Sequence, residues 1–97
     1  MTTLPEIKSA LQQHKLLLAD RFKVKTIGVF GSYVRGEQKD ESDIDILVEF
    51  SEPVGFFIFL DLEEYLAVLL GVKVDLVSKK ALKPRIGKHI LQEVVNL

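Results

Sequence analysis

A stretch of twenty residues, 31–50, constrains this chain more than any other part of it. It reads GSYVRGEQKDESDIDILVEF: a Gly-Ser pair, a ten-residue gap, and two aspartates that alternate with isoleucine. Successive side chains of a strand point to opposite faces, so the isoleucines share one face while Asp43 and Asp45 share the other. The pattern predicts a strand over residues 43–50, with one face in the core and a functional site beginning on the other.

The two aspartates are predicted to bind a metal ion. Asp43 and Asp45 lie roughly 6.6 Å apart along the strand, so both carboxylates can reach one cation. Aspartate is depleted in strand interiors and like charges repel, so the pair is unfavourable unless a positive charge offsets it. Asp75 repeats the anomaly between two apolar neighbours and is the predicted third ligand. Carboxylates are hard ligands and the chain has no cysteine, so we expect Mg²⁺, with Mn²⁺ as the alternative. Three carboxylates suit a two-ion site for displacement at phosphorus, and Asp75 could also accept the proton of the attacking group.

The Gly-Ser pair is predicted to bind phosphate. Gly31 and Ser32 follow a β-branched strand and precede one helical turn, so backbone N–H groups and the hydroxyl could hold phosphate oxygens there. The spacing to Gly36 matches a Walker A loop, but Glu37 stands where that motif needs lysine. A calcium-binding loop is also excluded, because its sixth position would be Val48 instead of glycine.

Simpler explanations exist for each part taken alone. A solvated strand end would explain Asp43 and Asp45, and an edge-strand charge would explain Asp75. Ser32 could be a helix N-cap, a role that is compatible with phosphate binding. Arg35 could pair with an acid of the following loop as readily as with a ligand. The occurrence of all the parts together favours a site.

The rest of the chain alternates helices and strands. We expect helices over residues 3–21, 32–35, 56–70 and 84–95, and strands over 24–30, 43–50 and 72–77. The core stripe of the third helix is predicted to be Phe59, Leu62, Leu66 and Leu69. Gly28, inside a strand, indicates that another segment or a ligand approaches closely. The order predicts a small α+β or α/β domain with a mixed three- or four-stranded sheet, and 97 residues are enough for one domain, 1–97.

Charge and composition limit the partners. The net charge is −1, so we do not expect nucleic acid to be recruited by an overall field. The charges are nevertheless uneven, since residues 37–52 hold seven acids and residues 79–88 hold five bases and no acid. The basic run could be a solvated face or could bind an acidic partner or RNA. No segment is long and apolar enough to span a membrane and no secretion signal is visible, so we expect a cytoplasmic protein without cysteine chemistry.

Taken together, these motifs resemble the minimal nucleotidyltransferases, the MNT or MntA-like antitoxins of the DNA polymerase beta type nucleotidyltransferase superfamily. The resemblance rests on Gly31-Ser32, Arg35-Gly36, the Ser-Asp-Ile-Asp sequence that ends at Asp45, and Asp75 in a Val-Asp-Leu-Val strand. It implies a mixed sheet with the aspartates on neighbouring strands, ATP with two magnesium ions, and transfer of a nucleoside monophosphate with release of pyrophosphate. It also implies that Gly31 and Ser32 bind phosphate, whereas Arg35 either touches phosphate or braces the loop.

The same resemblance implies a partner. Members of this group are commonly paired with a helical HEPN toxin ribonuclease, and some adenylylate a tyrosine of the toxin. Two alternatives stay open: a binding module that neutralises its partner by contact, and a nucleotidyltransferase for RNA ends or a small molecule. Independently of the resemblance, Phe56, Phe57, Ile58 and Tyr65 exceed what one helix face can bury. We therefore expect an interface on the helix over residues 56–70, either with a toxin or with a second copy of the chain.

Overall fold

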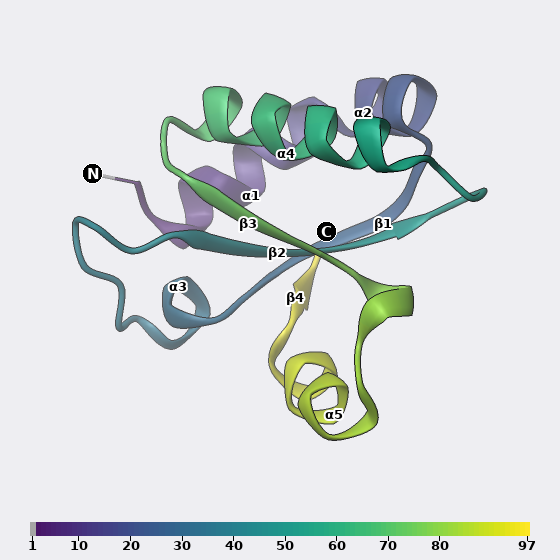
Figure 1. Ribbon diagram of the computed structural model, residues 1–97. Helices are drawn as coiled ribbons and strands as arrows, with labels where there is room; N and C mark the ends of the chain where they lie inside the picture. Colours follow the sequence, from purple (N-terminus) through teal and green to yellow (C-terminus); the bar gives the residue numbers. More distant parts are fainter. Residues whose placement is uncertain (1) are drawn as a thin grey trace.

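The computed structural model describes residues 2–97, which form ten elements built around one sheet (Figure 1). In chain order they are α1 (Leu4–Gln13), α2 (Lys15–Phe22), β1 (Val24–Phe30), α3 (Ser32–Arg35), β2 (Ile44–Phe50), α4 (Phe56–Leu70), β3 (Val74–Ser78), the 3₁₀ turn η1 (Lys79–Ala81), α5 (Pro84–Glu93) and β4 (Val95–Asn96). No helix in this described part of the chain has the length and apolar character needed to cross a membrane.

The sheet is mixed and has the strand order β3-β2-β1-β4. Strand β1 is antiparallel to both β2 and β4, whereas β2 and β3 are parallel. Two parallel neighbours need a crossover connection, and α4 supplies it. The predicted small mixed α+β fold is confirmed, with four strands.

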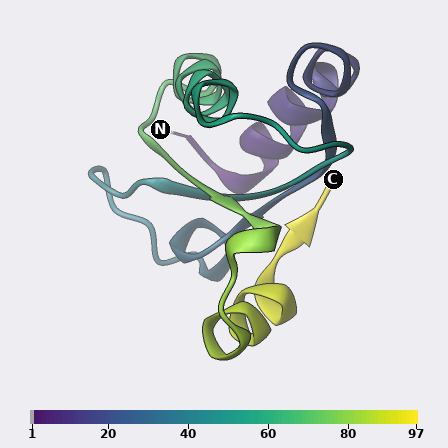
Figure 2. The same ribbon diagram turned by 45° about the vertical axis from the view of Figure 1, so that its right-hand side comes forward.

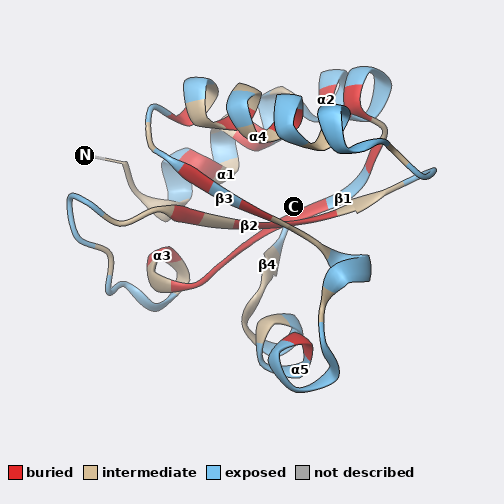
Figure 3. Cartoon of the chain, in the orientation of Figure 1, coloured by how far each residue is buried: buried red, intermediate tan, exposed pale blue. Residues whose placement is uncertain are grey.

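The core lies between the sheet and three helices. Helices α1, α2 and α4 cover one face of the sheet, whereas α3 and α5 lie on the other side (Figures 1 and 2). Buried side chains of β2 and of these helices belong to one hydrophobic cluster, and the buried segments of the chain are coloured red in Figure 3. The fully buried aliphatic residues are Ile7, Leu11, Leu18, Val29, Ile44, Ile46, Val48, Leu62 and Leu66. Burying each such side chain stabilises the fold by about 1.5–3 kcal/mol, so β2 is firmly held on the face opposite to its aspartates.

The single helix predicted over residues 3–21 is wrong, because the chain forms two helices that break at His14. The backbone N–H of His14 bonds back to the Leu11 carbonyl, 3.2 Å away. The ring Nδ1 of His14 lies 2.9 Å from the Ala10 carbonyl, which a continuous helix would pair with the backbone N–H of residue 14. The side chain thus takes the backbone's place, and α2 starts afresh at Lys15.

The C-terminal segment also departs from the prediction, since α5 ends at Glu93 and is followed by β4. Gly28 on β1 explains how β4 can dock: a β-carbon built there would lie 2.6 Å from Cγ2 of Val94. The close approach predicted at this glycine is therefore confirmed, and the approaching segment is β4. The third strand runs over Val74–Ser78 instead of residues 72–77, and α4 buries Leu70 while Phe59 and Leu69 are half-buried.

Candidate active site

The Gly-Ser turn begins at Gly31, directly after β1. The backbone of Gly31 (φ 82°, ψ −153°) lies in a region that essentially only glycine occupies. A β-carbon built there would clash with Oδ2 of Asp45 and lie 3.0 Å from its Cγ. Glycine is therefore required twice, by its conformation and by the Asp45 carboxylate that packs against it.

One helical turn, α3, follows from this glycine. The N–H groups of Val34 and Arg35 donate to the Gly31 carbonyl at 3.0 and 3.2 Å. The turn ends at Gly36, which is left-handed (φ 71°, ψ 22°) and donates its N–H to the Ser32 carbonyl. The predicted turn and its glycine stop are confirmed. Ser32 is half-buried and stands one residue from the point where Gly31 meets Asp45.

The predicted metal ligands lie near the start of two parallel strands. Asp45 on β2 is in register with Asp75 on β3. Register partners on neighbouring strands point to the same face, with backbones about 4.8 Å apart. Asp43 lies two positions before Asp45, just ahead of β2, and both it and Asp75 act electrostatically on Asp45.

Burial and these neighbours make ionisation of Asp45 less favourable than that of a free aspartate. Burial and the negative charges of Asp75 and Asp43 raise the pKa of the Asp45 carboxyl above its ordinary value. The positive charge of Arg35 opposes this shift, whereas Glu93 adds to it. The site thus concentrates negative charge that the nearby side chains offset only in part.

A divalent cation fits this set of donors. The carboxylates of Asp43, Asp45 and Asp75 are the hard oxygen ligands that Mg²⁺ and Mn²⁺ prefer, and a cation would relieve the repulsion felt by Asp45. Within residues 2–97 no three acidic or histidine side chains form a complete ligand set as they stand. The strand register aligns the carboxylates along one face, and side-chain rotation is what would bring them onto one ion.

Arg35 is held by two carboxylates. Its Nε donates to Glu37 Oε1 at 2.6 Å, and its Nη1 donates to Glu93 Oε1 at 2.5 Å. The other oxygen of Glu93 accepts the N–H of Gly31 at 3.0 Å. Burial works against ionisation of Glu93, but the bonds from Arg35 and Gly31 outweigh it and lower the pKa of this carboxyl. The ion pair between Arg35 and the following loop is confirmed at Glu37, and the tie to Glu93 is new.

Sequence reasoning missed Glu93, although the sequence contains one signal. Glu93 is the sole acidic residue from position 79 to the end of the chain, in an otherwise basic segment. It is also the last residue of α5, where the helix dipole disfavours a negative charge. An acid placed there needs a partner, but nothing local to the sequence identifies Gly31 and Arg35, 62 and 58 residues away.

The lysines of the basic run have different neighbours. Lys83 lines a shallow pocket beside Asp75, between β3 and α5. Lys79 instead approaches Glu49 at 3.9 Å, and Lys80 lines a pocket with Glu49 at the far end of β2. The apolar side chains around the Asp75 pocket are Phe30, Val77, Ala81, Leu82, Ile86 and Ile90.

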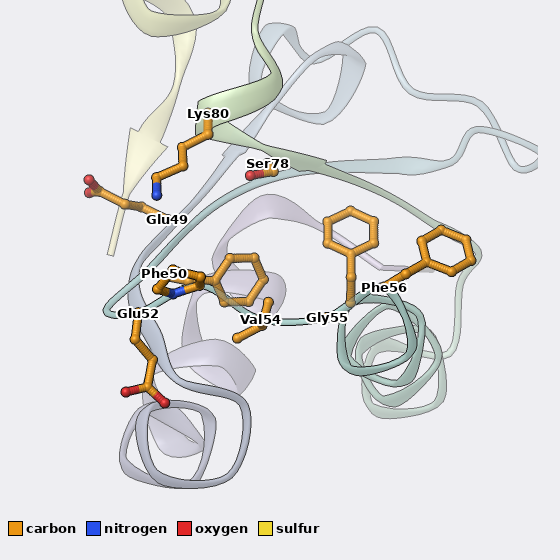
Figure 4. A pocket seen from close by; sticks show the side chains of 10 residues that line it. Glu49, Phe50, Glu52, Val54, Gly55, Phe56, Ser78 and Lys80 are labelled. Carbon is orange, nitrogen blue, oxygen red and sulfur yellow. The ribbon is translucent and has the colours of Figure 1, made fainter.

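A second, more enclosed pocket lies away from the aspartates. It has a volume of about 320 Å³ and sits between the end of β2, the loop that follows, and the start of α4 (Figure 4). Phe50, Val54, Phe56 and Phe59 supply its apolar lining, with Glu49, Glu52 and Lys80 among its polar residues. None of the predicted site residues lines this pocket, so it is separate from the candidate active site.

A mixed sheet that carries aspartates on two neighbouring strands, beside a glycine-serine turn, is the arrangement that the resemblance to the nucleotidyltransferases implied. A family model described as the nucleotidyltransferase domain matches residues 11–96. The chain therefore belongs to the nucleotidyltransferase family and is an enzyme of that class, as its resemblance implied.

Individual relatives are similar over nearly the whole chain. The protein adenylyltransferase MntA of Thermococcus cleftensis is 58% identical over 95 residues, which cover 98% of this chain and 96% of the relative. A solved structure described as a minimal nucleotidyltransferase is 35% identical, with a TM-score of 0.77 and coverage of 94% and 95% of the two chains. A toxin-antitoxin structure with AMP-PNP is 26% identical, with a TM-score of 0.72, and covers 88% of this chain and 70% of that one.

Proposed function

We propose that this chain is a magnesium-dependent adenylyltransferase that transfers AMP from ATP to a tyrosine of a HEPN-type toxin and thereby acts as its antitoxin. The observation that carries the proposal is the register of Asp45 with Asp75, next to the contact between Asp45 and Gly31. It joins a group of metal-binding carboxylates to a turn suited to phosphate.

The triphosphate would be bound at the turn. Ser32 is the first residue of α3, directly after the Gly31 that meets Asp45, and its hydroxyl can donate to a phosphate oxygen. Asp43, Asp45 and Asp75 would hold the magnesium ions. These ions, when bound, would neutralise charge on the carboxylates and on the triphosphate. Arg35 adds a fixed positive charge close enough to Asp45 to affect its ionisation.

The acceptor would enter on the side of Asp75. This aspartate is exposed and lines the shallow pocket that Lys83 shares. The acceptor oxygen forms a bond to the α-phosphorus, and the bond from that phosphorus to the bridging oxygen breaks. Asp75 accepts the hydroxyl proton, and pyrophosphate leaves with the electron pair.

The relatives support the kind of acceptor. The name of the Thermococcus cleftensis relative states transfer of an adenylyl group to protein, and the AMP-PNP structure is described as a toxin-antitoxin pair. Transfer of AMP from ATP to a toxin is the activity that agrees with both descriptions and with this site.

Incubation with ATP labelled at the α-phosphate, magnesium and the partner toxin tests the proposal. We expect label on the toxin with the wild type, and at least a hundredfold less with the double variant Asp43→Asn, Asp45→Asn, because loss of a residue that only supports a metal ligand already costs roughly 10–100-fold in metal affinity or activity and this variant loses two proposed ligands. Asp40→Asn, an exposed change in the same loop, is the matched control and should transfer normally. Label transfer that survives the double variant would reject the assigned site.

A second candidate function, neutralisation by contact alone, is favoured by the start of α4. Phe56 and Phe57 are 69% and 81% exposed there, which is unusual for large aromatic side chains. If contact suffices, the double aspartate variant should still neutralise the toxin in cells, whereas Phe57→Ser should not. Loss of neutralisation in the double aspartate variant, with toxin binding retained, assigns the effect to adenylyl transfer.

A further inference from the structure

Glu93, a carboxylate outside the predicted site, makes two contacts with the Gly-Ser turn. Oε2 of Glu93 accepts the N–H of Gly31 at 3.0 Å, and Oε1 accepts Nη1 of Arg35 at 2.5 Å. Both ends of α3, the glycine before it and the arginine that completes it, are thus tied to a single side chain of α5.

The sheet delivers Glu93 to this position. Val95 and Asn96 of β4 pair with Val29 and Gly28 of β1. Glu93 precedes Val95 by two residues and Gly31 follows Val29 by two, so this antiparallel pairing brings Glu93, at the end of α5, close to Gly31. Because Val94 packs into the space that Gly28 leaves open, the placement rests on backbone pairing and close packing.

The contact decides which donors of the turn can meet a phosphate. The N–H of Gly31 is already used by Glu93 and is not available to a phosphate oxygen, whereas the Ser32 hydroxyl and Arg35 can still donate. Arg35 has five N–H donors in a planar group, of which Glu37 and Glu93 occupy one each. The two anchors fix the plane of the guanidinium and leave its other donors available.

A merely structural tie would not need a charge here. An amide oxygen could also accept the Gly31 N–H, without adding a negative charge to a neighbourhood that already holds three aspartates. The charge on Glu93 works against ionisation of Asp45. The negative charge of Glu93 strengthens its bond with Arg35, because hydrogen bonds between ionised partners are roughly twice as strong as neutral ones.

We propose that Glu93 is a positioning residue, which orients the Gly31 peptide and holds Arg35 so that the guanidinium faces the triphosphate. The inference rests on the proposed function, because it presumes a nucleotide at Ser32. Glu93 itself touches neither the nucleotide nor the reacting atoms and acts through Arg35.

Nucleotide affinity and kinetics of matched variants test it. Glu93→Gln keeps an acceptor for Gly31 but loses the charged pairing. We expect its melting temperature to stay near that of the wild type, while KM for ATP rises about tenfold, which corresponds to about 1.4 kcal/mol. Gln92→Ala, the exposed neighbour on α5, is the control and should leave KM unchanged. Equal KM values for Glu93→Gln and Gln92→Ala would overturn the inference.

A double-variant cycle separates positioning from any direct role. In the Arg35→Ala background, Glu93→Gln should raise KM no further, because its effect passes through Arg35. Additive effects would contradict the proposal.

A measurement without nucleotide completes the test. Hydrogen exchange of the Gly31 amide should be slow in the wild type and in Glu93→Gln, and much faster in Glu93→Ala. Unchanged exchange in Glu93→Ala would show that the contact does not hold the turn. If the wild type binds no ATP with magnesium, the proposed function fails and this inference fails with it; if the wild type binds and only the Glu93 effects are missing, the proposed function stands alone.

Discussion

Gly31, the first residue of the Gly-Ser turn, packs against Asp45 of β2. We expect Gly31→Ala to reduce adenylyl transfer by at least a hundredfold, because the new β-carbon must displace the Asp45 carboxylate. The unfavourable backbone region should also destabilise the fold by about 1–3 kcal/mol. Transfer assays and chemical denaturation measure the two effects.

Gly36→Ala is the matched control for this change. Gly36 also has a positive φ, 71°, but a β-carbon there would meet nothing within 4 Å. Gly36→Ala should therefore lose stability, by about 1–2 kcal/mol, and keep most of its activity once folded. Equal losses of activity in both variants would show that backbone strain matters and the contact with Asp45 does not.

We expect the charge of Asp45 to destabilise the fold, although the proposed activity needs this carboxylate. Burial and the charges of Asp75 and Asp43 raise the pKa of Asp45 in the folded state. A carboxyl whose pKa is raised on folding destabilises the fold once pH exceeds that folded pKa, and this penalty disappears below the unfolded value. Asp45→Asn should therefore melt higher than the wild type at pH 7, with the gap closing as pH falls through the folded pKa.

The expected gap at pH 7 is roughly 2–4 °C, less than a fully buried charge would give, because solvent screens a half-exposed carboxylate. Melting curves of both proteins from pH 3 to pH 8 measure it. A gap of the opposite sign, or one that widens as pH falls, would contradict the electrostatic account of the site.

Some residues of the candidate site can be predicted from the sequence, and others cannot. Gly31, Ser32, Asp43 and Asp45 lie within fifteen residues, so strand alternation and turn chemistry suffice to propose them together. Asp75 stands out because an acid in an apolar strand needs an explanation. Glu93 could not be paired with Gly31 by any local pattern, since their contact depends on how β4 docks.

Among the elements, β4 affects the candidate site through its pairing with β1, which brings Glu93 close to Gly31. We expect Gly28→Ala to destabilise the protein by about 1–3 kcal/mol, because a β-carbon would lie 2.6 Å from Val94 and overpack the junction. Amide exchange at Val95 and Asn96 should rise with it. Gly55→Ala, where a β-carbon meets nothing within 4 Å, is the control; a loss of stability as large in that variant would remove the explanation.

Element boundaries follow from sequence where a residue with special geometry marks them. Gly36 and Gly71 end α3 and α4 in left-handed conformations, as their positions indicated. The break at His14 was not predictable from apolar periodicity, because the stripe continues across it and a histidine ring replaces a backbone bond. Strand β4 was not predictable either, since two paired residues have no periodicity to detect.

At the scale of the whole molecule, the aromatic start of α4 is the proposed partner surface. Phe57 is 81% exposed and adjoins the apolar pocket through Phe56. We expect Phe57→Ser to weaken association with the toxin at least tenfold, while the melting temperature and ATP binding stay unchanged. Truncating a side chain that is a hot spot of an interface costs about 2 kcal/mol or more.

Leu16→Ser on α2, a site that is 87% exposed, is the control for this change and should leave association intact. Sedimentation of the chain alone reports in the same series whether α4 also mediates self-association. Toxin binding that is unaffected by Phe57→Ser would move the interface away from this helix.

Calorimetric titration of ATP, with and without magnesium, tests the central claim most directly. The account predicts saturable binding by the wild type that is at least tenfold tighter with magnesium, and no such gain in the double variant Asp43→Asn, Asp45→Asn. Binding of equal strength with and without magnesium, or a magnesium gain retained by the double variant, would contradict it.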